Sequence, residues 1–154
     1  MKRGVFVLKK VRKDLIALGA AIVLLAGLLV AIGINSGEAK LNFVALEEAK
    51  IPQAIVTDVI PEYRELERAL ACKVDDKIYV IVTRGEKPTT GFEVAIDRMS
   101  LKQEDEKSKL IVYAKFADPA KGASNAQVLS YPYAVAEVEI RGLPDMIELQ
   151  VQYL

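Results

Sequence analysis

The chain has 154 residues, which is enough for one globular domain and an extension, and its 21 Lys and Arg side chains balance 21 Asp and Glu side chains. This balance argues against a uniformly basic nucleic-acid-binding protein, so no nucleic-acid partner is expected. There is no histidine, which excludes Ser-His-Asp and Cys-His nucleophile systems and histidine-based zinc sites. The single cysteine, Cys72, cannot close an intramolecular disulfide and is expected to be a buried small hydrophobic residue. We therefore expect a protein that is not an enzyme, with no catalytic residues, no metal site and no cofactor.

A basic segment and then a long apolar run form the N-terminal part of the chain. Residues 1–14 carry six Lys or Arg and one Asp, and residues 15–34 carry no charge. A helix from Leu15 to Ile34 would be about 30 Å long, which is the thickness of the hydrocarbon core of a bilayer. We predict a transmembrane helix there, with membrane lipid as its partner. The positive-inside rule makes residues 1–14 cytoplasmic and places the C-terminal part outside, in a single-pass protein of the cell membrane.

A cleaved signal peptide is the alternative interpretation of the same segment. Its apolar region would normally be shorter, and no clear small-x-small cleavage site precedes Asn35. An uncleaved anchor is therefore favoured. Residues 35–50 are interpreted as a tether, in which residues 41–44 form either a brief strand or part of the tether. Residues 51–154 are interpreted as the extracytoplasmic domain.

One or two helices are predicted next. Pro52 suits an early helix position, and Pro61 either kinks this helix or begins a second one. Residues 62–71 are rich in Glu, Arg, Leu and Ala, which favour helices, and Leu66 and Leu70 are spaced by four residues.

The remainder of the chain has the two-residue period of strands with one buried face. Five such segments follow one another: residues 78–83, 92–97, 110–116, 133–140 and 147–153. Residues 102–109 (KQEDEKSK) are interpreted as a solvated connection. The fold class predicted is α+β: the transmembrane helix, then one or two helices and a mainly antiparallel β domain of five to seven strands, in one sheet or as a sandwich.

Residues 85–92 (GEKPTTGF) form the first notable motif, a connection between two predicted strands. It is either a well-formed structural turn or a loop presented to a partner. The glycine and lysine spacing does not match a phosphate-binding loop, and no helix follows. The candidate partner-binding residues in this motif are Lys87, Pro88, Thr89, Thr90, Gly91 and Phe92.

The second motif is Ser-Tyr-Pro-Tyr at residues 130–133, which leads into a predicted strand. An X-Pro turn with flanking aromatic residues allows a cis bond before Pro132. In the structural interpretation, Tyr133 belongs to the core and Pro132 begins the strand. In the functional interpretation, an exposed Tyr131 contributes to an interface, where tyrosine is enriched. Tyr131, Pro132 and Tyr133 are therefore added to the candidate partner-binding residues.

With these motifs in view, residues 77–140 resemble the C-terminal domain of the PrcB family, whose members are described as protease complex subunits. The resemblance depends on residues 85–94 (GEKPTTGFEV) and on residues 127–140 (QVLSYPYAVAEVEI), in the same order as in the family. This chain has Thr90 and Phe92 where the family often has Gly and Tyr. The resemblance implies no catalysis and suggests a role in the assembly or stability of a surface protease.

A shorter stretch, Pro-Thr-Thr-Gly-Phe at residues 88–92, is similar to a loop of chagasin-like cysteine-peptidase inhibitors. Three hypotheses therefore stand. The first is a membrane-anchored extracytoplasmic binding module that assists or stabilises a surface protease. The others are a chagasin-like peptidase inhibitor and a structural envelope protein with no link to a protease. If the protein were an enzyme, a carboxylate-dependent hydrolase is the class that would be abandoned last. No Asp or Glu pair has a spacing that singles it out as an acid/base couple, and nothing in the sequence indicates a substrate.

Overall fold

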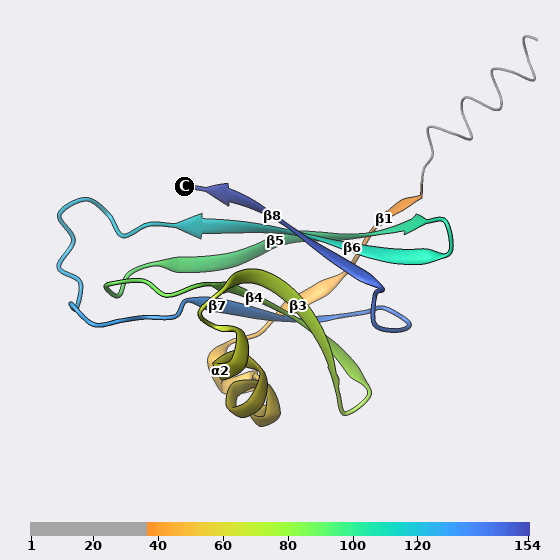
Figure 1. Ribbon diagram of the computed structural model, residues 1–154, viewed down its shortest axis with the longest axis horizontal. Helices are drawn as coiled ribbons and strands as arrows, with labels where there is room; N and C mark the ends of the chain where they lie inside the picture. The colour runs from red at the N-terminus through yellow and green to blue at the C-terminus, as the bar shows by residue number, and fades with distance from the viewer. Residues whose placement is uncertain (1–36) are drawn as a thin grey trace, which may run out of the picture. The chain divides into compact units, whose positions relative to one another are not determined.

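Two four-stranded β-sheets form the domain. Figure 1 shows the computed structural model, in which the two sheets pack face to face. The structure describes residues 37–154. The predicted transmembrane helix between Leu15 and Ile34 lies outside the described residues. Within residues 37–154, no helix has the length and apolar character needed to cross a membrane.

The first sheet has the strand order β1-β5-β6-β8. Its strands are β1 (Glu38–Lys40), β5 (Glu93–Glu104), β6 (Lys107–Ala117) and β8 (Met146–Tyr153). Neighbours are antiparallel except β6 and β8, which are parallel. Because β7 lies in the other sheet, the chain crosses between sheets before β8, and this crossover allows the parallel pair.

The second sheet has the strand order β2-β7-β4-β3, and all its neighbours are antiparallel. Its strands are β2 (Phe43–Ala45), β7 (Tyr133–Val138), β4 (Lys77–Arg84) and β3 (Glu67–Val74). Strands β1 and β2 are consecutive in the chain and lie in different sheets, so residues within the expected tether contribute to both sheets.

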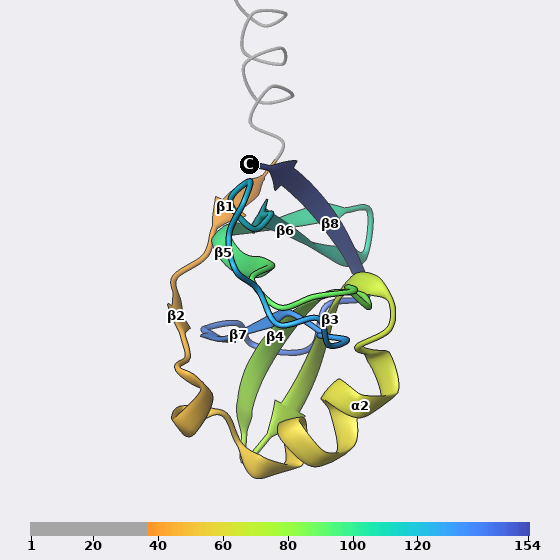
Figure 2. The ribbon, with the colours of Figure 1, turned by 90° about the vertical axis from the view of Figure 1, so that its left-hand side faces the viewer.

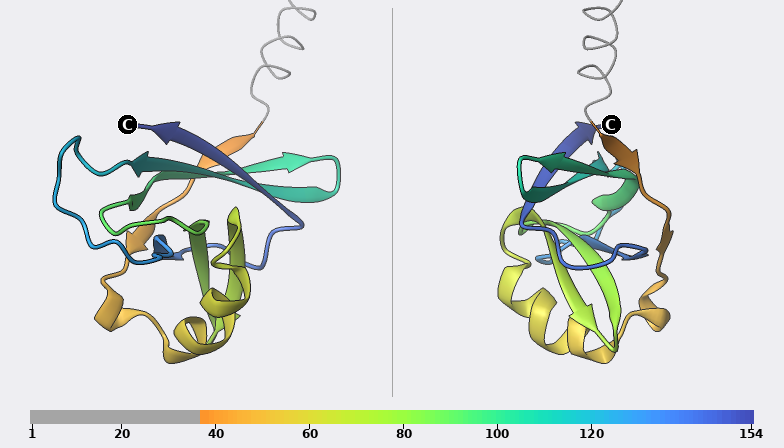
Figure 3. Two further views of the ribbon diagram at one scale, coloured as in Figure 1. Left: turned by 60° about the vertical axis from the view of Figure 1, so that its left-hand side comes forward. Right: turned by 90° about the vertical axis from the view of Figure 1, so that its right-hand side faces the viewer.

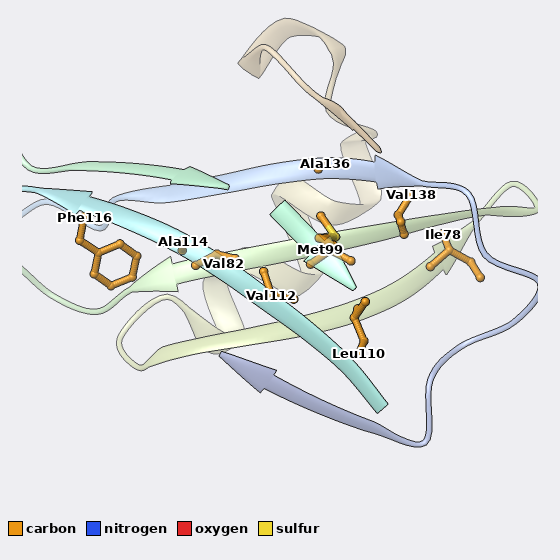
Figure 4. Packing of buried hydrophobic residues seen from close by; sticks show 10 residues of the cluster. Ile78, Val82, Met99, Leu110, Val112, Ala114, Phe116, Ala136 and Val138 are labelled. Carbon is orange, nitrogen blue, oxygen red and sulfur yellow. The ribbon is translucent and has the colours of Figure 1, made fainter. Parts of the chain in front are cut away.

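The main hydrophobic core lies between the two sheets (Figure 4). Alternate residues of β4, β5, β6 and β7 supply it, as expected for strands that bury one face. The buried side chains are Ile78, Val80, Val82, Met99, Leu110, Val112, Ala114, Phe116, Ala136 and Val138.

A second core lies on the other face of the β2-β7-β4-β3 sheet. Short helical segments cover that face: η1 (Glu48–Lys50), the π-type turn η2 (Ile55–Val59) and α2 (Ile60–Tyr63). Figure 2 shows α2 beside β3. Ile55 and Ile60 pack there against Tyr79 and Ile81. Strand β4 is therefore buried on both faces, which explains why its sequence is a continuous apolar run.

The predicted α+β class is wrong, because the described domain is mostly β, with eight strands rather than five to seven and a single short α-helix. The error lies in residues 62–71, where the helix α2 ends at Tyr63 and β3 begins at Glu67. Along β3, Ala69 and Ala71 pack on the core between the sheets, whereas Leu70 packs on the second core. Pairing with β4 therefore overrides the helix propensity of the segment.

The charged segment at residues 102–109 is a β-hairpin rather than a connection without strands. Strands β5 and β6 continue to Glu104 and from Lys107, and Figure 3 shows the resulting long hairpin. Its charged side chains pair on the sheet surface, with Lys102 Nζ 2.7 Å from a carboxylate oxygen of Glu104. A strand whose solvent-exposed face carries charged side chains can therefore have a sequence that resembles a polar loop.

Candidate functional site

The two motif loops meet at one end of the sandwich. Residues 85–92 connect β4 to β5, and residues 118–132 connect β6 to β7; both lie on the left of Figure 1. We call them together the loop pair. Lys87 and Ser130 form an antiparallel bridge, in which each N–H donates to the other residue's C=O at 2.9 Å. The sequence motifs are thus held together by backbone hydrogen bonds.

The threonines of the first loop are engaged in the same contact. The N–H of Thr90 donates to the C=O of Ala126 at 3.1 Å, and the N–H of Ala126 donates to Thr90 Oγ1 at 3.0 Å. Ser130 Oγ donates to the C=O of Thr89 at 2.6 Å. These polar groups hold one loop against the other, so they are already satisfied and do not form a free chemical site.

Gly91 allows the second loop to pass close to the first. Its φ is +93°, which L side chains rarely adopt. A Cβ at this position would lie 2.4 Å from Oδ1 of Asn125 and 3.1 Å from Cβ of Pro119. Glycine is therefore required at this position both by the positive φ and by the closeness of the second loop.

Arg84 anchors the loop pair at the ends of the strands that carry it. Its side chain is 3% exposed, and its Nη1 donates to the C=O of Ala117 at 2.6 Å and to that of Glu93 at 3.3 Å. Its guanidinium also pairs with Asp118 and lies about 5 Å from the ring centres of Phe92 (5.0 Å) and Phe116 (5.1 Å). This single side chain therefore fixes the end of β4 to the start of β5 and the end of β6.

Tyr131 connects the loop pair to the turn that follows α2. Its hydroxyl donates to Oε2 of Glu86 at 2.8 Å, and this hydrogen bond raises the pKa of Tyr131. The Arg64 guanidinium lies 4.2 Å from the centre of the Tyr131 ring, a cation–π contact. The peptide bond between Tyr131 and Pro132 is trans.

The three candidate residues of the second motif, Tyr131, Pro132 and Tyr133, have different roles in the structure. The C=O of Pro132 accepts a hydrogen bond from the N–H of Arg84 at 3.0 Å, as a strand start would. Tyr133 packs against the second core and belongs to the fold, and its burial raises the pKa of its hydroxyl. A shallow hollow of about 280 Å³ lies beside it, next to Leu46 and Ile51. Of the three, Tyr131 alone bonds a side chain of the first loop.

The most exposed apolar surface of the loop pair belongs to residues that were not among the candidate partner-binding residues. Val128 and Leu129 are 56% and 59% exposed and directly precede Ser130. Pro88, in the facing loop, is also exposed. An adjacent pair of apolar residues in a long polar loop is the signal that was available in the sequence. Arg84 gave a weaker signal, as a charge at the end of a buried strand.

The loop pair offers a surface on which another molecule can be bound. Within residues 37–154 no group of three or more His, Cys, Asp or Glu side chains is placed to hold a metal ion. Several polar side chains of the loop pair bond to backbone or to each other, among them Thr90, Ser130 and Tyr131. The site can therefore present a shaped, partly apolar surface.

Residues 78–139 match the family model described as PrcB C-terminal, which confirms the predicted resemblance. The matched segment runs from β4 through β7 and contains both loops. No curated protein and no solved structure matches the chain.

Proposed function

We propose that this chain, with its PrcB C-terminal segment, is a non-enzymatic binding module whose loop pair docks on an extracytoplasmic protein of a protease complex. The observation that carries the proposal is that Val128 and Leu129 are exposed on a loop whose position is fixed. Backbone hydrogen bonds to the first loop and the Arg84 side chain hold this loop in place. Exposed apolar side chains on a preorganised loop lower the ordering cost of binding. Loops held on a rigid scaffold commonly carry function.

The family match supports the nature of the partner. PrcB-like proteins are described as protease complex subunits, and the matched segment contains the whole loop pair. A peptidase, or a protein that accompanies one, is therefore the partner class that the proposal names.

The N-terminal sequence supports a membrane location. The uncharged run ends at Ile34, four residues before β1 begins at Glu38. Glu38 pairs with Lys102, whereas the loop pair adjoins Glu93 at the other end of β5. Nine residues of strand span about 30 Å. In this proposal, the apolar run anchors the protein in the cell membrane, and the loops lie at the end of the domain away from β1.

A capture experiment tests the proposed function. The full-length chain is immobilised in detergent and exposed to solubilised envelope proteins, alongside Leu129→Asp and Leu143→Asp. Leu143 is similarly exposed, at 52%, but lies beyond the opposite end of β7. We expect one peptidase-associated protein with the wild type and with Leu143→Asp, and its loss with Leu129→Asp. Equal retention by all three, or no retained protein, would refute the proposal.

A chagasin-like inhibitor is the second candidate, because the Pro-Thr-Thr-Gly-Phe loop lies at the end of a two-sheet sandwich beside another loop. The activity of a captured peptidase distinguishes the two functions. Activity that is kept or raised supports a stabilising subunit, and loss of activity supports the inhibitor.

The proposed orientation of the chain in the membrane is tested separately. In a Cys72→Ser background, Ser36→Cys in intact cells should react with a membrane-impermeant thiol reagent. Reaction only after lysis would contradict the proposed orientation.

A further inference from the structure

Strand β3 is a long, open edge of the β2-β7-β4-β3 sheet. It pairs with β4 on one side, and no described strand is paired with its other side. The opposite edge of this sheet, β2, has three residues, whereas β3 has eight. A long edge strand is a template for pairing with another chain.

The hairpin between β3 and β4 determines which backbone groups of β3 point outward. Asp75 and Asp76 have φ of +48° and +62°, as in a two-residue type I′ turn, so Val74 and Lys77 form a hydrogen-bonded pair. Such pairs alternate along an antiparallel ladder. The residues whose N–H and C=O groups point away from β4 are therefore Glu67, Ala69, Ala71 and Lys73.

We propose that β3 pairs antiparallel with β3 of a second copy of this chain, about a two-fold axis that passes beside Leu70. In this register Glu67 lies opposite Lys73 of the other copy, and Ala69 lies opposite Ala71. Every outward-pointing residue is then in a hydrogen-bonded pair. The two sheets join into one continuous sheet across the two copies.

The charges select this register and favour a second copy as the occupant. Because the axis generates the contact twice, Glu67 and Lys73 form two opposite-charge cross-strand pairs, which stabilise a sheet. Moving the axis to Ala69 or Ala71 keeps the backbone pattern but leaves both charges without this partner. A strand with Glu at one end and Lys at the other is complementary to its own antiparallel copy.

Neither charged residue is held firmly elsewhere. Lys73 Nζ lies 2.8 Å from a carboxylate oxygen of Asp76, with the two side chains 54% and 94% exposed. Glu67 accepts a hydrogen bond of 2.7 Å from the hydroxyl of Tyr153, which is 62% exposed. Exposed contacts of this kind contribute little to stability, so pairing with a second copy can replace them.

The test is the mass of the full-length protein in detergent, measured by light scattering after gel filtration. We expect a dimer for the wild type. Lys73→Glu places two Glu–Glu pairs across the axis and should raise the dimer dissociation constant at least about tenfold. The combined Glu67→Lys and Lys73→Glu exchange restores both opposite-charge pairs and should restore the dimer.

A second measurement locates the axis. In a Cys72→Ser background, Leu70→Cys places two thiols opposite each other and should cross-link the copies under mild oxidation. Unfolding curves check that each variant is folded. A monomeric wild type at about 100 μM, or a dimer that persists in Lys73→Glu, would overturn the proposal. Failure of the folded double exchange to restore the dimer would also overturn it.

Discussion

Gly91→Ala tests whether the close contact between the two loops stabilises the fold. At φ +93° an L side chain costs about 1–2 kcal/mol. In addition, the new Cβ would lie 2.4 Å from Oδ1 of Asn125 and 3.1 Å from Cβ of Pro119. The Asn125 amide can rotate, but the proline ring and its backbone must shift, which costs about 1–3 kcal/mol.

A matched control separates these two effects. Gly122 has φ +82° and no atom within 4 Å of an added Cβ, so Gly122→Ala has the backbone cost alone. Alanine also restricts the unfolded chain and returns about 0.4–1 kcal/mol in both variants. We expect a loss of about 2–4 kcal/mol for Gly91→Ala and of about 1 kcal/mol for Gly122→Ala.

Urea unfolding of the full-length chain measures both free energies, and hydrogen exchange measures the local effect. The amides of Thr90 and Ala126, which bond across the loops, should exchange faster in Gly91→Ala than in Gly122→Ala. If the two variants lose the same stability and exchange alike, the close approach of the second loop to Gly91 does not contribute to the stability of the loop pair.

Three further predictions concern single side chains. Arg84→Met leaves the carbonyl of Ala117 without its donor and should cost about 2–4 kcal/mol by urea unfolding. The pKa of Asp145 lies below its ordinary value of 3.8, because its carboxylate accepts hydrogen bonds from the N–H and hydroxyl of Ser108. The hydrogen-bonded carboxylate therefore stabilises the folded state above pH 3.8, and this stability is lost as the pH falls through the lower pKa that Asp145 has in the folded state. In Asp145→Asn, the free energy of unfolding should depend less steeply on pH in this acidic range. Burial raises the pKa of the Cys72 thiol, so this thiol should react with a disulfide reagent at pH 8 more slowly than free cysteine.

Each of these has an outcome that counts against it. Arg98→Met, at an exposed arginine stacked on Tyr113, is the control for Arg84, and equal losses would show that Arg84 is no anchor. If the free energy of unfolding of Asp145→Asn depends on acidic pH as steeply as that of the wild type, the Ser108 hydrogen bonds do not stabilise the folded state. Reaction of Cys72 at the rate of free cysteine would show that β3 opens readily.

Five of the eight strands were predictable from the sequence, because each alternates apolar and polar side chains or is continuously apolar. Strand β3 was not, because its residues favour helices and its leucines match a helical spacing. What decides its structure is pairing with the apolar strand β4, which follows across a two-residue turn and lies outside the segment when the segment is read alone. The parallel pairing of β8 with β6 was equally hidden, because it requires a crossover between sheets.

The two motifs were identified from the sequence, but their contact was not. The bridge between Lys87 and Ser130 joins residues that are far apart in the chain. The sequence suggested Thr90 as an exposed contact residue, whereas the structure uses it to hold the second loop. Thr90→Arg would therefore disturb the loop pair itself, and substitutions at Val128 or Leu129 are cleaner tests of binding.

Photo-crosslinking in intact cells tests the central claim most directly, that the loop pair contacts a partner protein. The photo-reactive amino acid p-benzoylphenylalanine replaces Val128 in one strain and Leu143 in another, both exposed positions at opposite ends of β7. We predict one defined adduct with a peptidase or an associated envelope protein from the Val128 position and none from the Leu143 position. No adduct from the Val128 position in a correctly inserted protein, or the same adduct from both positions, would contradict the account.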